Sequence, residues 1–452
     1  MINTGKKDIV VSYLAYFLRL TANIILLPII LSQLSTDEYG AWNIFISIGA
    51  IVNLVDVGFG SVLTRYSTYA FCGARSIGEK GLPEMGEESN TNYELLNKVF
   101  YVAKRIYSKL FAITIIISVV LTGYILFKTV QLLDTVYVVS AWLIYAASCC
   151  MQIYYVSYNC IIKGMGNIKE SSGYFIIQQV VHIALAFILL RLGFGLIGLA
   201  TSHFVSTLVF RVLNSRFLKK KLSLSKDILL EMKADISTEY EAVYAAVKKN
   251  TKEIALVTVS NYFSNYGMTL ICSMFLPLSA IASIGITNQL IGVVGGIANG
   301  VFSSYISKMG DMLINGKLKK LRSLFSKLNV WFILAYVVGT VAVVFVGPIA
   351  LRIIQSDTQL LNTPIILLMA LSSFLINNHQ RCTNFIMLSN RQPHVKAYFI
   401  TTLAVLIASF ACMLLSHSVL GYIIPNLVIQ AFYNGWKWPL EAYKKLGYKK
   451  QV

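Results

Sequence analysis

The chain has 452 residues, of which 56% are hydrophobic and 13% charged, and its formal net charge is +19. An ordinary soluble protein, with a charged share of about 25%, is excluded by this composition. Apolar runs of about 18 or more residues recur along the whole chain, and each is long enough to cross the hydrocarbon core of a bilayer. The sequence predicts an all-α polytopic membrane protein, because a β-barrel would show short segments of alternating polarity.

About twelve transmembrane helices are expected, with both ends of the chain in the cytoplasm. The first run, Ile9 to Leu31, is too long for a signal-peptide core and is interpreted as a retained span. This arrangement places most lysines and arginines inside, and the outer loops hold Lys128, Arg191 and Arg352, which fits the positive-inside rule. The expected spans are residues 9–31, 40–67, 108–128, 135–162, 171–190, 193–215, 253–275, 280–307, 328–347, 360–388, 397–415 and 420–438.

Membrane orientation accounts for the positive charge without a nucleic-acid partner, since the short loops lack the aromatic or motif context of an RNA-binding patch. The seven cysteines lie within or beside the expected spans in no metal-ligand spacing. We interpret them as small apolar packing residues. Neither a metal site nor a cofactor is expected.

Polar residues repeat between the two halves of the chain, which indicates duplicated bundles. Ser148 and Gln152 recur at a constant spacing as Ser373 and Asn377, and the stretch "EYGAWN" resembles "SIGITN" in the second half. Chance similarity among apolar helices is the alternative explanation. The repeat predicts two pseudo-symmetric, parallel six-helix bundles.

Three segments follow from this division. Residues 1–217 form the N-terminal six-helix bundle, and residues 251–452 form the C-terminal bundle with a basic cytoplasmic tail. Residues 218–250 read as a cytoplasmic amphipathic linker, either a hinge or membrane anchor or simply a solvated connection.

The first expected span carries a polar stripe, Ser12, Tyr16, Arg19 and Asn23, whose spacing places all four residues on one helix face. Arg19 lies near mid-membrane, where an arginine facing lipid is costly, so this face is expected to border a wet interior.

Two further spans carry similar stripes. The seventh has Thr258, Asn261, Asn265 and Thr269, and the tenth has Ser373, Asn377, Arg381 and Asn384. Hydrogen bonding between helices is the alternative role for the amides and hydroxyls.

The stretch "NLVDVGFGSVLTRY" places Asp56 and Arg65 in the second span, nine residues apart. On one straight helix they would lie on opposite faces and could not pair. Arg65 is near the cytoplasmic end, where it could equally reach lipid headgroups. Together with Arg19 and Arg381 it predicts a positively charged interior suited to an anionic substrate. Asp56 is the candidate for coupling to H+ or Na+, and a permanent salt bridge is its alternative role.

The stretch "LSTDEYGAWNIFISIGAIVNLVDVGFGSVLTRY" resembles the opening of Wzx-type flippases for lipid-linked oligosaccharides, such as O-antigen repeat units. These belong to the polysaccharide-transporter branch of the multidrug/oligosaccharidyl-lipid/polysaccharide (MOP) superfamily, which also holds the MATE transporters. The resemblance implies a MATE-like fold and translocation of undecaprenyl-pyrophosphate-linked oligosaccharide across the bacterial inner membrane. It also implies alternating access around a cationic lumen, driven by an ion gradient as in an antiporter.

The resemblance also implies which residues form the site. The lumen would be formed by Arg19, Arg65, Arg381, Asn23, Asn261, Asn265 and Asn377, with Asp56 as the ion-coupling group. The implied partners are membrane lipid, the lipid-linked sugar, and a polysaccharide polymerase and chain-length regulator of lipopolysaccharide or surface-polysaccharide biosynthesis.

Two other classes compete with this interpretation. A MATE-type drug exporter carries organic cations, which an arginine-rich interior would repel. A membrane-embedded polymerase or glycosyltransferase would need a sizeable external loop or a set of metal-binding carboxylates. No Walker A motif, His-Glu metal motif or nucleophile elbow appears, so we expect a transporter with no catalytic residue rather than an enzyme.

Overall fold

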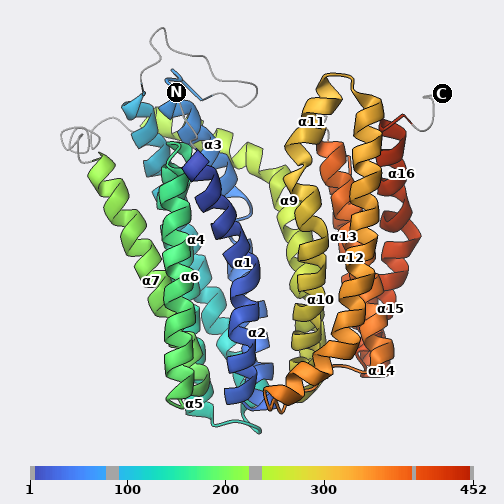
Figure 1. Cartoon of the computed structure of the whole chain (residues 1–452). Helices are drawn as coiled ribbons and strands as arrows, with labels where there is room; N and C mark the ends of the chain where they lie inside the picture. The colour runs from blue at the N-terminus through green and yellow to red at the C-terminus, as the bar shows by residue number, and fades with distance from the viewer. Residues whose placement is uncertain (1–5, 78–90, 223–236, 389–392, 448–452) are drawn as a thin grey trace. The chain divides into compact units, whose positions relative to one another are not determined.

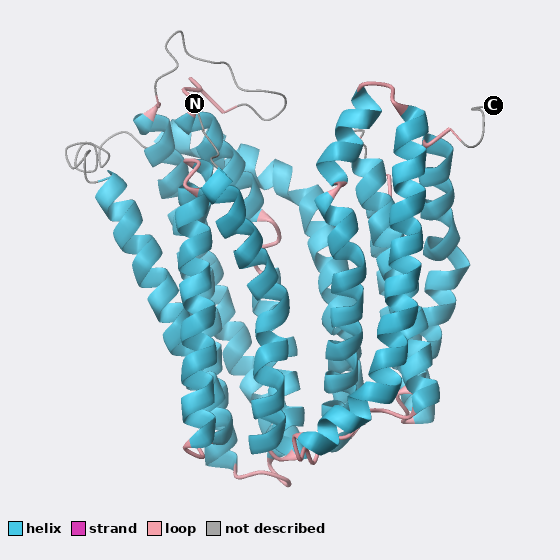
Figure 2. Cartoon of the chain, in the orientation of Figure 1, coloured by secondary structure: helices cyan, strands magenta, loops and turns pink. Residues whose placement is uncertain are grey.

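The computed structural model describes residues 6–77, 91–222, 237–388 and 393–447, and this part of the chain folds into helices without strands (Figures 1 and 2). The all-α prediction is confirmed. The helices are α1 (Lys6–Gln33), α2 (Thr36–Leu54), α3 (Phe59–Phe71), α4 (Tyr93–Thr129), α5 (Thr135–Gly164), α6 (Ile168–Arg191), α7 (Gly195–Leu222), α9 (Ser237–Phe275), α10 (Leu278–Ser304), α11 (Ile306–Ile314), α12 (Leu318–Ile353), α13 (Thr363–Met387), α14 (Val395–Ser416), α15 (Leu420–Ile429), the π-helix η2 (Gln430–Asn434) and α16 (Gly435–Lys445).

Side-chain caps set where several of these helices begin. Asn92 and Asp134 each accept a hydrogen bond from a backbone N–H three residues on, which fixes the starts of α4 and α5. Before α2, Ser35 and Glu38 exchange hydrogen bonds: the Ser35 N–H donates to the Glu38 carboxylate at 2.9 Å, and the Glu38 N–H donates to the Ser35 hydroxyl at 3.3 Å. This reciprocal pair is a capping box.

Each of the twelve expected spans coincides with one helix or with consecutive helices. By length and composition, seven of the described helices could cross a membrane. Large apolar side chains on α4 and α12 point outward, including Val120 and Phe345, each 68% exposed. Surfaces this apolar are unfavourable in water and suit contact with lipid.

The second expected span is not one straight helix, and this part of the prediction is wrong. It divides into α2 and α3 around Asp56, because Val57 and Gly58 have φ angles of 37° and 90° that an α-helix cannot accommodate. Glycine adopts such an angle without a steric penalty. Asp56 therefore lies in a turn, and the argument that placed it and Arg65 on opposite faces of one helix does not apply.

The twelfth span is also interrupted. The wide turn of η2 separates α15 from α16, and its two polar ends bond to each other, since the Asn434 amide donates to Gln430 Oε1 at 3.0 Å. The same amide lies 2.9 Å from the Thr401 hydroxyl on α14, and Trp438 Nε1 donates to Asn434 Oδ1 at 2.9 Å. These bonds tie the side chains of the π-helix to one another, to α14 and to α16.

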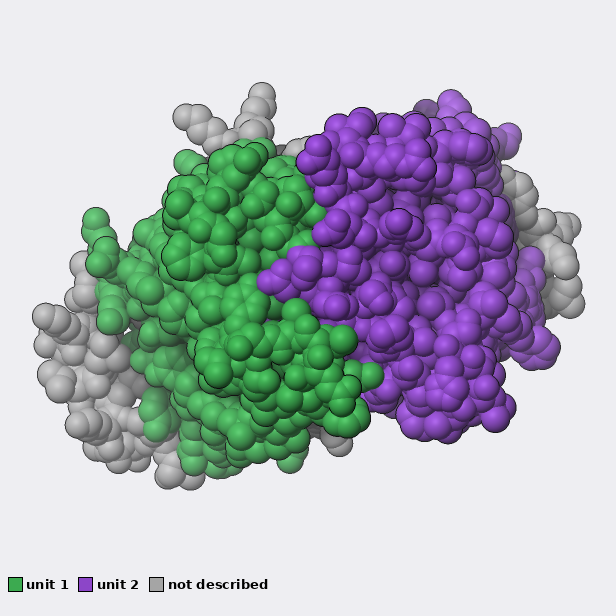
Figure 3. Space-filling view, turned by 90° about the horizontal axis from the view of Figure 1, so that it is seen from below, with its two compact units in different colours: residues 1–34, 48–259 green, residues 35–47, 260–452 purple. Residues whose placement is uncertain are grey.

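The described chain clusters into two compact units (Figure 3). Unit 1 comprises residues 1–34 and 48–259, and unit 2 comprises residues 35–47 and 260–452. The boundaries fall inside α2 and α9, so each of these helices contributes to both units. Of the expected linker, residues 223–236 lie outside the described residues, and the residues on either side continue α7 and α9.

Unit 1 is organised around α5, which packs against α3, α4 and α7, while α6 packs between α1 and α7. Unit 2 has α10 against α12 and α13, α14 against α15, and α16 against α13. At one end of unit 2, Phe302, Phe325, Phe385 and Trp438 are almost fully buried in a common apolar cluster. Both units thus have cores of their own.

Candidate functional site

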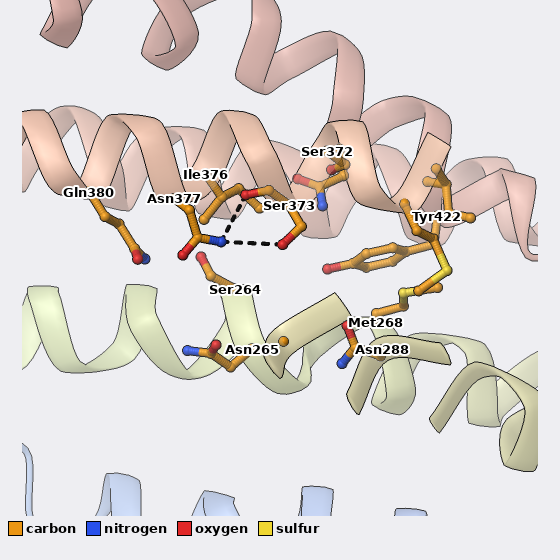
Figure 4. Close-up of a pocket in the computed structure, with 14 residues that line it drawn as sticks. Ser264, Asn265, Met268, Asn288, Ser372, Ser373, Ile376, Asn377, Gln380 and Tyr422 are labelled. Carbon is orange, nitrogen blue, oxygen red and sulfur yellow. Dashed lines mark hydrogen bonds between the residues drawn. The ribbon is translucent and has the colours of Figure 1, made fainter. Parts of the chain in front are cut away.

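Unit 2 contains a cavity of about 180 Å³ between α9, α10, α13 and α15 (Figure 4). Most of the side chains that line it carry neutral polar groups, and none of the lining residues is charged. The polar members are Ser264, Asn265, Asn288, Ser372, Ser373, Asn377, Gln380, Tyr422 and Asn426.

Asn377 is the best-connected member of this lining. Its amide nitrogen donates to Tyr336 Oη at 2.7 Å and to the Ser373 carbonyl at 2.9 Å, and its amide oxygen accepts from Asn299 at 2.6 Å. Tyr336 Oη also lies 3.1 Å from the Ser373 hydroxyl. These bonds fix the orientation of the α13 side of the cavity before any ligand binds.

The α9 side of the cavity is held through Tyr398 on α14. Its hydroxyl lies 2.9 Å from Ser264 Oγ and 3.1 Å from Asn261 Oδ1, and it accepts from Gln380 at 3.3 Å. Asn265, one turn from Asn261, is exposed, and its amide donates to the Asn261 carbonyl at 2.7 Å. Figure 4 shows Ser264 and Asn265 across the cavity from Asn377 and Gln380.

The lining predicts the chemistry of a ligand. Amides and hydroxyls both donate and accept hydrogen bonds, so together they match a neutral group with many hydroxyls. A carboxylate, which would attract an organic cation, is missing from the lining residues. The cavity therefore suits a sugar better than a cationic drug.

The sequence-predicted residues fall in different places. Asn265 and Asn377 line the cavity, and Asn261 supports it through Tyr398. Arg65 lies in unit 1 on α3, where it is exposed and 5.7 Å from the centre of the Tyr66 ring. The side chains of Arg19 and Asn23 lie outside the described residues.

Arg381 is on the polar stripe of α13 but does not belong to the cavity lining. It is 2% exposed, and its guanidinium carbon lies 4.2 Å from the ring centre of Phe332. Nη2 donates to Asn329 and, at 2.7 Å, to Asn378. Two more rings complete this aromatic cage, those of Phe302 and Phe325 at 5.5 and 5.9 Å. Contact of Arg381 with substrate stays a prediction.

Asp56 forms an acidic site in unit 1, at the turn between α2 and α3. The Tyr107 hydroxyl on α4 donates to Asp56 Oδ1, and the Gly60 N–H donates to the same oxygen at 3.2 Å. Within the described residues Asp56 makes no ion pair, so the permanent salt bridge finds no partner there.

The sequence analysis missed three residues near this acid. Tyr107 and Cys160 belong to the site directly, and Arg211 on α7 lies within electrostatic reach of both. Arg211 is only 7% exposed and stacks 4.9 Å from the Phe210 ring centre. An arginine inside an expected span could have indicated a functional residue. Because Arg211 lies near the cytoplasmic end of its span, however, the sequence did not predict that it is buried.

Unit 1 holds a polar cluster where the repeat would place the counterpart of the unit 2 cavity. Ser148, the counterpart of Ser373, lies 2.8 Å from His203 Nδ1 and donates to Thr207 at 3.1 Å. His182 bonds to Ser202 at 3.2 Å, and its ring centre is 5.6 Å from that of His203. These groups satisfy one another inside the unit.

The sequence matches no protein-family model and no curated protein. Among solved structures, one described as the inward-facing conformation of a multidrug resistance MATE family transporter of the MOP superfamily has a TM-score of 0.65 at 14% identity, covering 98% of this chain and 99% of that one. A structure of the outward-facing conformation of such a transporter has a TM-score of 0.56 at 14% identity and covers 99% of this chain and 97% of that one. A MATE structure in complex with MaD3S has a TM-score of 0.53 at 12% identity, covering 97% and 96%. Over almost its whole length, therefore, this chain has the MATE-like transporter fold.

Proposed function

We propose that this protein is a flippase that moves undecaprenyl-pyrophosphate-linked oligosaccharide repeat units from the cytoplasmic to the periplasmic leaflet of the bacterial inner membrane. The product would be used for O-antigen or surface-polysaccharide biosynthesis. Movement would occur by alternating access, coupled to an H+ or Na+ gradient. The neutral cavity of unit 2 supports this proposal most directly, because its amides and hydroxyls match the hydroxyl groups of a sugar.

The fold supports transport in general. Structures with this fold include transporters described in inward-facing and outward-facing conformations, the two states that alternating access requires. Groups of three or more His, Cys, Asp or Glu residues that could hold a metal are absent from the described residues. A metal-dependent glycosyltransferase thus gains no support from this part of the chain.

The diphosphate of such a substrate needs positive groups. Arg19, Arg65 and Arg381 stay the candidates, together with Asn23, which follows Arg19 by four residues in the sequence. Of the two arginines with described side chains, Arg65 is exposed and accessible to a ligand, whereas Arg381 could reach one only if its aromatic cage opened. A guanidinium binds phosphate through paired charge-assisted hydrogen bonds, which a neutral amide cannot replace.

The cavity gives the first test. Asn265→Ala removes an exposed amide whose described bond is to its own helix, so folding should be preserved. A neutral hydrogen bond to substrate contributes about 1 kcal/mol, so transport efficiency for the lipid-linked sugar should fall about fivefold, measured in vesicles by access of the sugar to an external lectin. The matched control is Gln33→Ala, which removes an exposed amide outside the cavity and should transport normally. Equal transport by both variants would remove Asn265 from the site.

The MATE-type exporter of cationic drugs is the second candidate, because the similar structures include transporters described as multidrug resistance proteins. Deleting the gene should leave resistance to cationic dyes unchanged and remove surface polysaccharide. Loss of dye resistance with normal polysaccharide would favour the exporter.

The orientation of the chain in the membrane provides a test of the proposed direction of transport. The charge distribution predicts that both termini lie in the cytoplasm, and α12 joins Lys317 at its start to the segment that contains Asp357. A reporter active only in the periplasm should be silent when fused after Lys221 or Lys317 and active when fused near Asp37 or Asp357. The reverse pattern would invert the proposed direction of transport.

A further inference from the structure

Polar groups from three parts of unit 1 meet above Gly60. A Cβ atom added to this glycine would lie 3.2 Å from Asp56 Oδ2, 3.3 Å from Tyr107 Oη and 3.4 Å from Cys160 Sγ. The missing side chain of Gly60 is therefore what gives the three groups room to converge.

The two oxygens of Asp56 differ in their surroundings. Oδ1 accepts both described hydrogen bonds, from the Tyr107 hydroxyl and the Gly60 N–H. Within the described residues Oδ2 has no donor, and it is not sealed from solvent, since Asp56 is only partly buried. Oδ2 is consequently the atom on which a proton can be bound and released.

The groups around Asp56 come from several neighbouring helices of unit 1. Thr64 of α3 bonds back to the Gly60 carbonyl, and Ile254 of α9 packs against Gly58. The titratable or charged groups are Tyr107 of α4, Cys160 of α5 and Arg211 of α7, with Lys163 acting electrostatically on Cys160. Of these described groups, Asp56 is the one that carries a carboxyl.

This set of groups does not suit a metal cation. A hard cation needs several oxygen ligands, whereas here Tyr107 and Gly60 direct hydrogens toward Asp56 and Cys160 offers a soft sulfur. The positive charge of Arg211 also opposes a second cation close by. A proton needs one free carboxylate oxygen only.

We infer that Asp56 Oδ2 binds a proton in a site completed by Tyr107 and Gly60, and that the proton, not sodium, is the coupling ion. The coupling part of this inference rests on the proposed transport function. In the binding step a hydronium ion gives its proton to the charged carboxylate, which becomes a neutral carboxyl, and a water molecule is released. Neutralisation weakens the charge-assisted bond from Tyr107, and this bond lies at the turn between α2 and α3.

The first experiment measures proton binding without transport. The purified full-length protein in lipid nanodiscs is titrated with acid, and the C=O band of a protonated carboxyl is followed by infrared difference spectroscopy. One such band should be missing from Asp56→Asn. Tyr107→Phe removes a donor to the charged form, so it should move the midpoint upward by at least one pH unit, a tenfold change in proton affinity.

Tyr155→Phe is the matched control, because this tyrosine on α5 has no described bond to the site, and its titration should equal that of the wild type. Sodium should leave the band unchanged. A difference band that persists in Asp56→Asn, an unchanged midpoint in Tyr107→Phe, or displacement of the proton by sodium would each overturn the inference.

The second experiment uses vesicles loaded with lipid-linked oligosaccharide. A pH gradient should drive transport and a sodium gradient should not, and Asp56→Asn should lose the response to pH. If Asp56 titrates as expected but the sugar lipid is not moved, the proposed function fails and the proton site stands. If the sugar lipid is moved by a sodium gradient, the proposed function stands and the proton inference fails.

Discussion

Arg381→Ala should destabilise the protein by about 3 kcal/mol or more. The substitution empties a cage formed by three phenylalanine rings, and it leaves the side-chain oxygens of Asn329 and Asn378 without their donor. We expect a lower thermal midpoint of the purified protein and a lower amount in the membrane.

Two companion variants separate support of the fold from contact with substrate. Arg381→Met keeps the volume and places a polarizable thioether among the rings, and replacing a buried charge by an apolar side chain is often neutral for stability. Arg381→Lys keeps the charge and loses the planar pair of donors. If Arg381→Met is stable and transports, the residue supports the fold. If it is stable and inactive while Arg381→Lys is partly active, the charge acts on the substrate, as the sequence analysis predicts.

Gly40→Ala should be among the most damaging alanine substitutions at the glycines that the structure describes. A Cβ atom at Gly40 would lie 2.2 Å from the carbonyl oxygen of Leu278, and a backbone atom cannot turn aside as a flexible side chain can. Overpacking of this kind costs about 1–3 kcal/mol, occasionally more. Thermal unfolding and the yield in the membrane should both report the loss.

Gly123→Ala is the control for this prediction. A Cβ atom at Gly123, inside α4, would meet nothing within 4 Å. Alanine loses less backbone entropy than glycine in a helix, so this variant should gain about 0.5–1 kcal/mol. Equal melting of the two alanine variants would show that α2 and α10 can separate without penalty.

The sequence predicted the helices well, because hydropathy and span length decide where a chain can cross a bilayer. It did not predict the turn at Asp56. Glycine is common in membrane-spanning helices, so "DVGFG" alone does not indicate a break. The positive φ angles and the packing of Ile254 against Gly58 arise from tertiary structure.

The site was predicted in part. The stripe on α13 placed Asn377 and Arg381 on one face of the helix. Helical periodicity predicts the direction of a side chain around the helix axis, but it does not predict how far along the axis a cavity extends. The cavity lining on α13 ends at Gln380, so Arg381 lies beyond it among phenylalanines from other helices. Tyr107 and Arg211 were missed because their place near this site depends on how α4 packs against α3 and how α7 packs against α5.

The π-helical turn at Gln430–Asn434 holds one residue more than a regular helical turn, and this affects which deletions the last helix can accept. Trp438, Ala442 and Leu446 are buried in the apolar cluster of unit 2 and follow one another at intervals of a helical turn. Each residue of an α-helix advances the direction of its side chains by about 100°. Deleting one residue from the wide turn would restore a regular helix and leave all three side chains facing the core, because the turn already absorbs one extra residue. Deleting one residue between the turn and Trp438 would instead rotate all three out of the core together. Natural variants of this chain should therefore tolerate the loss of one residue within Gln430–Asn434, but not within residues 435–437.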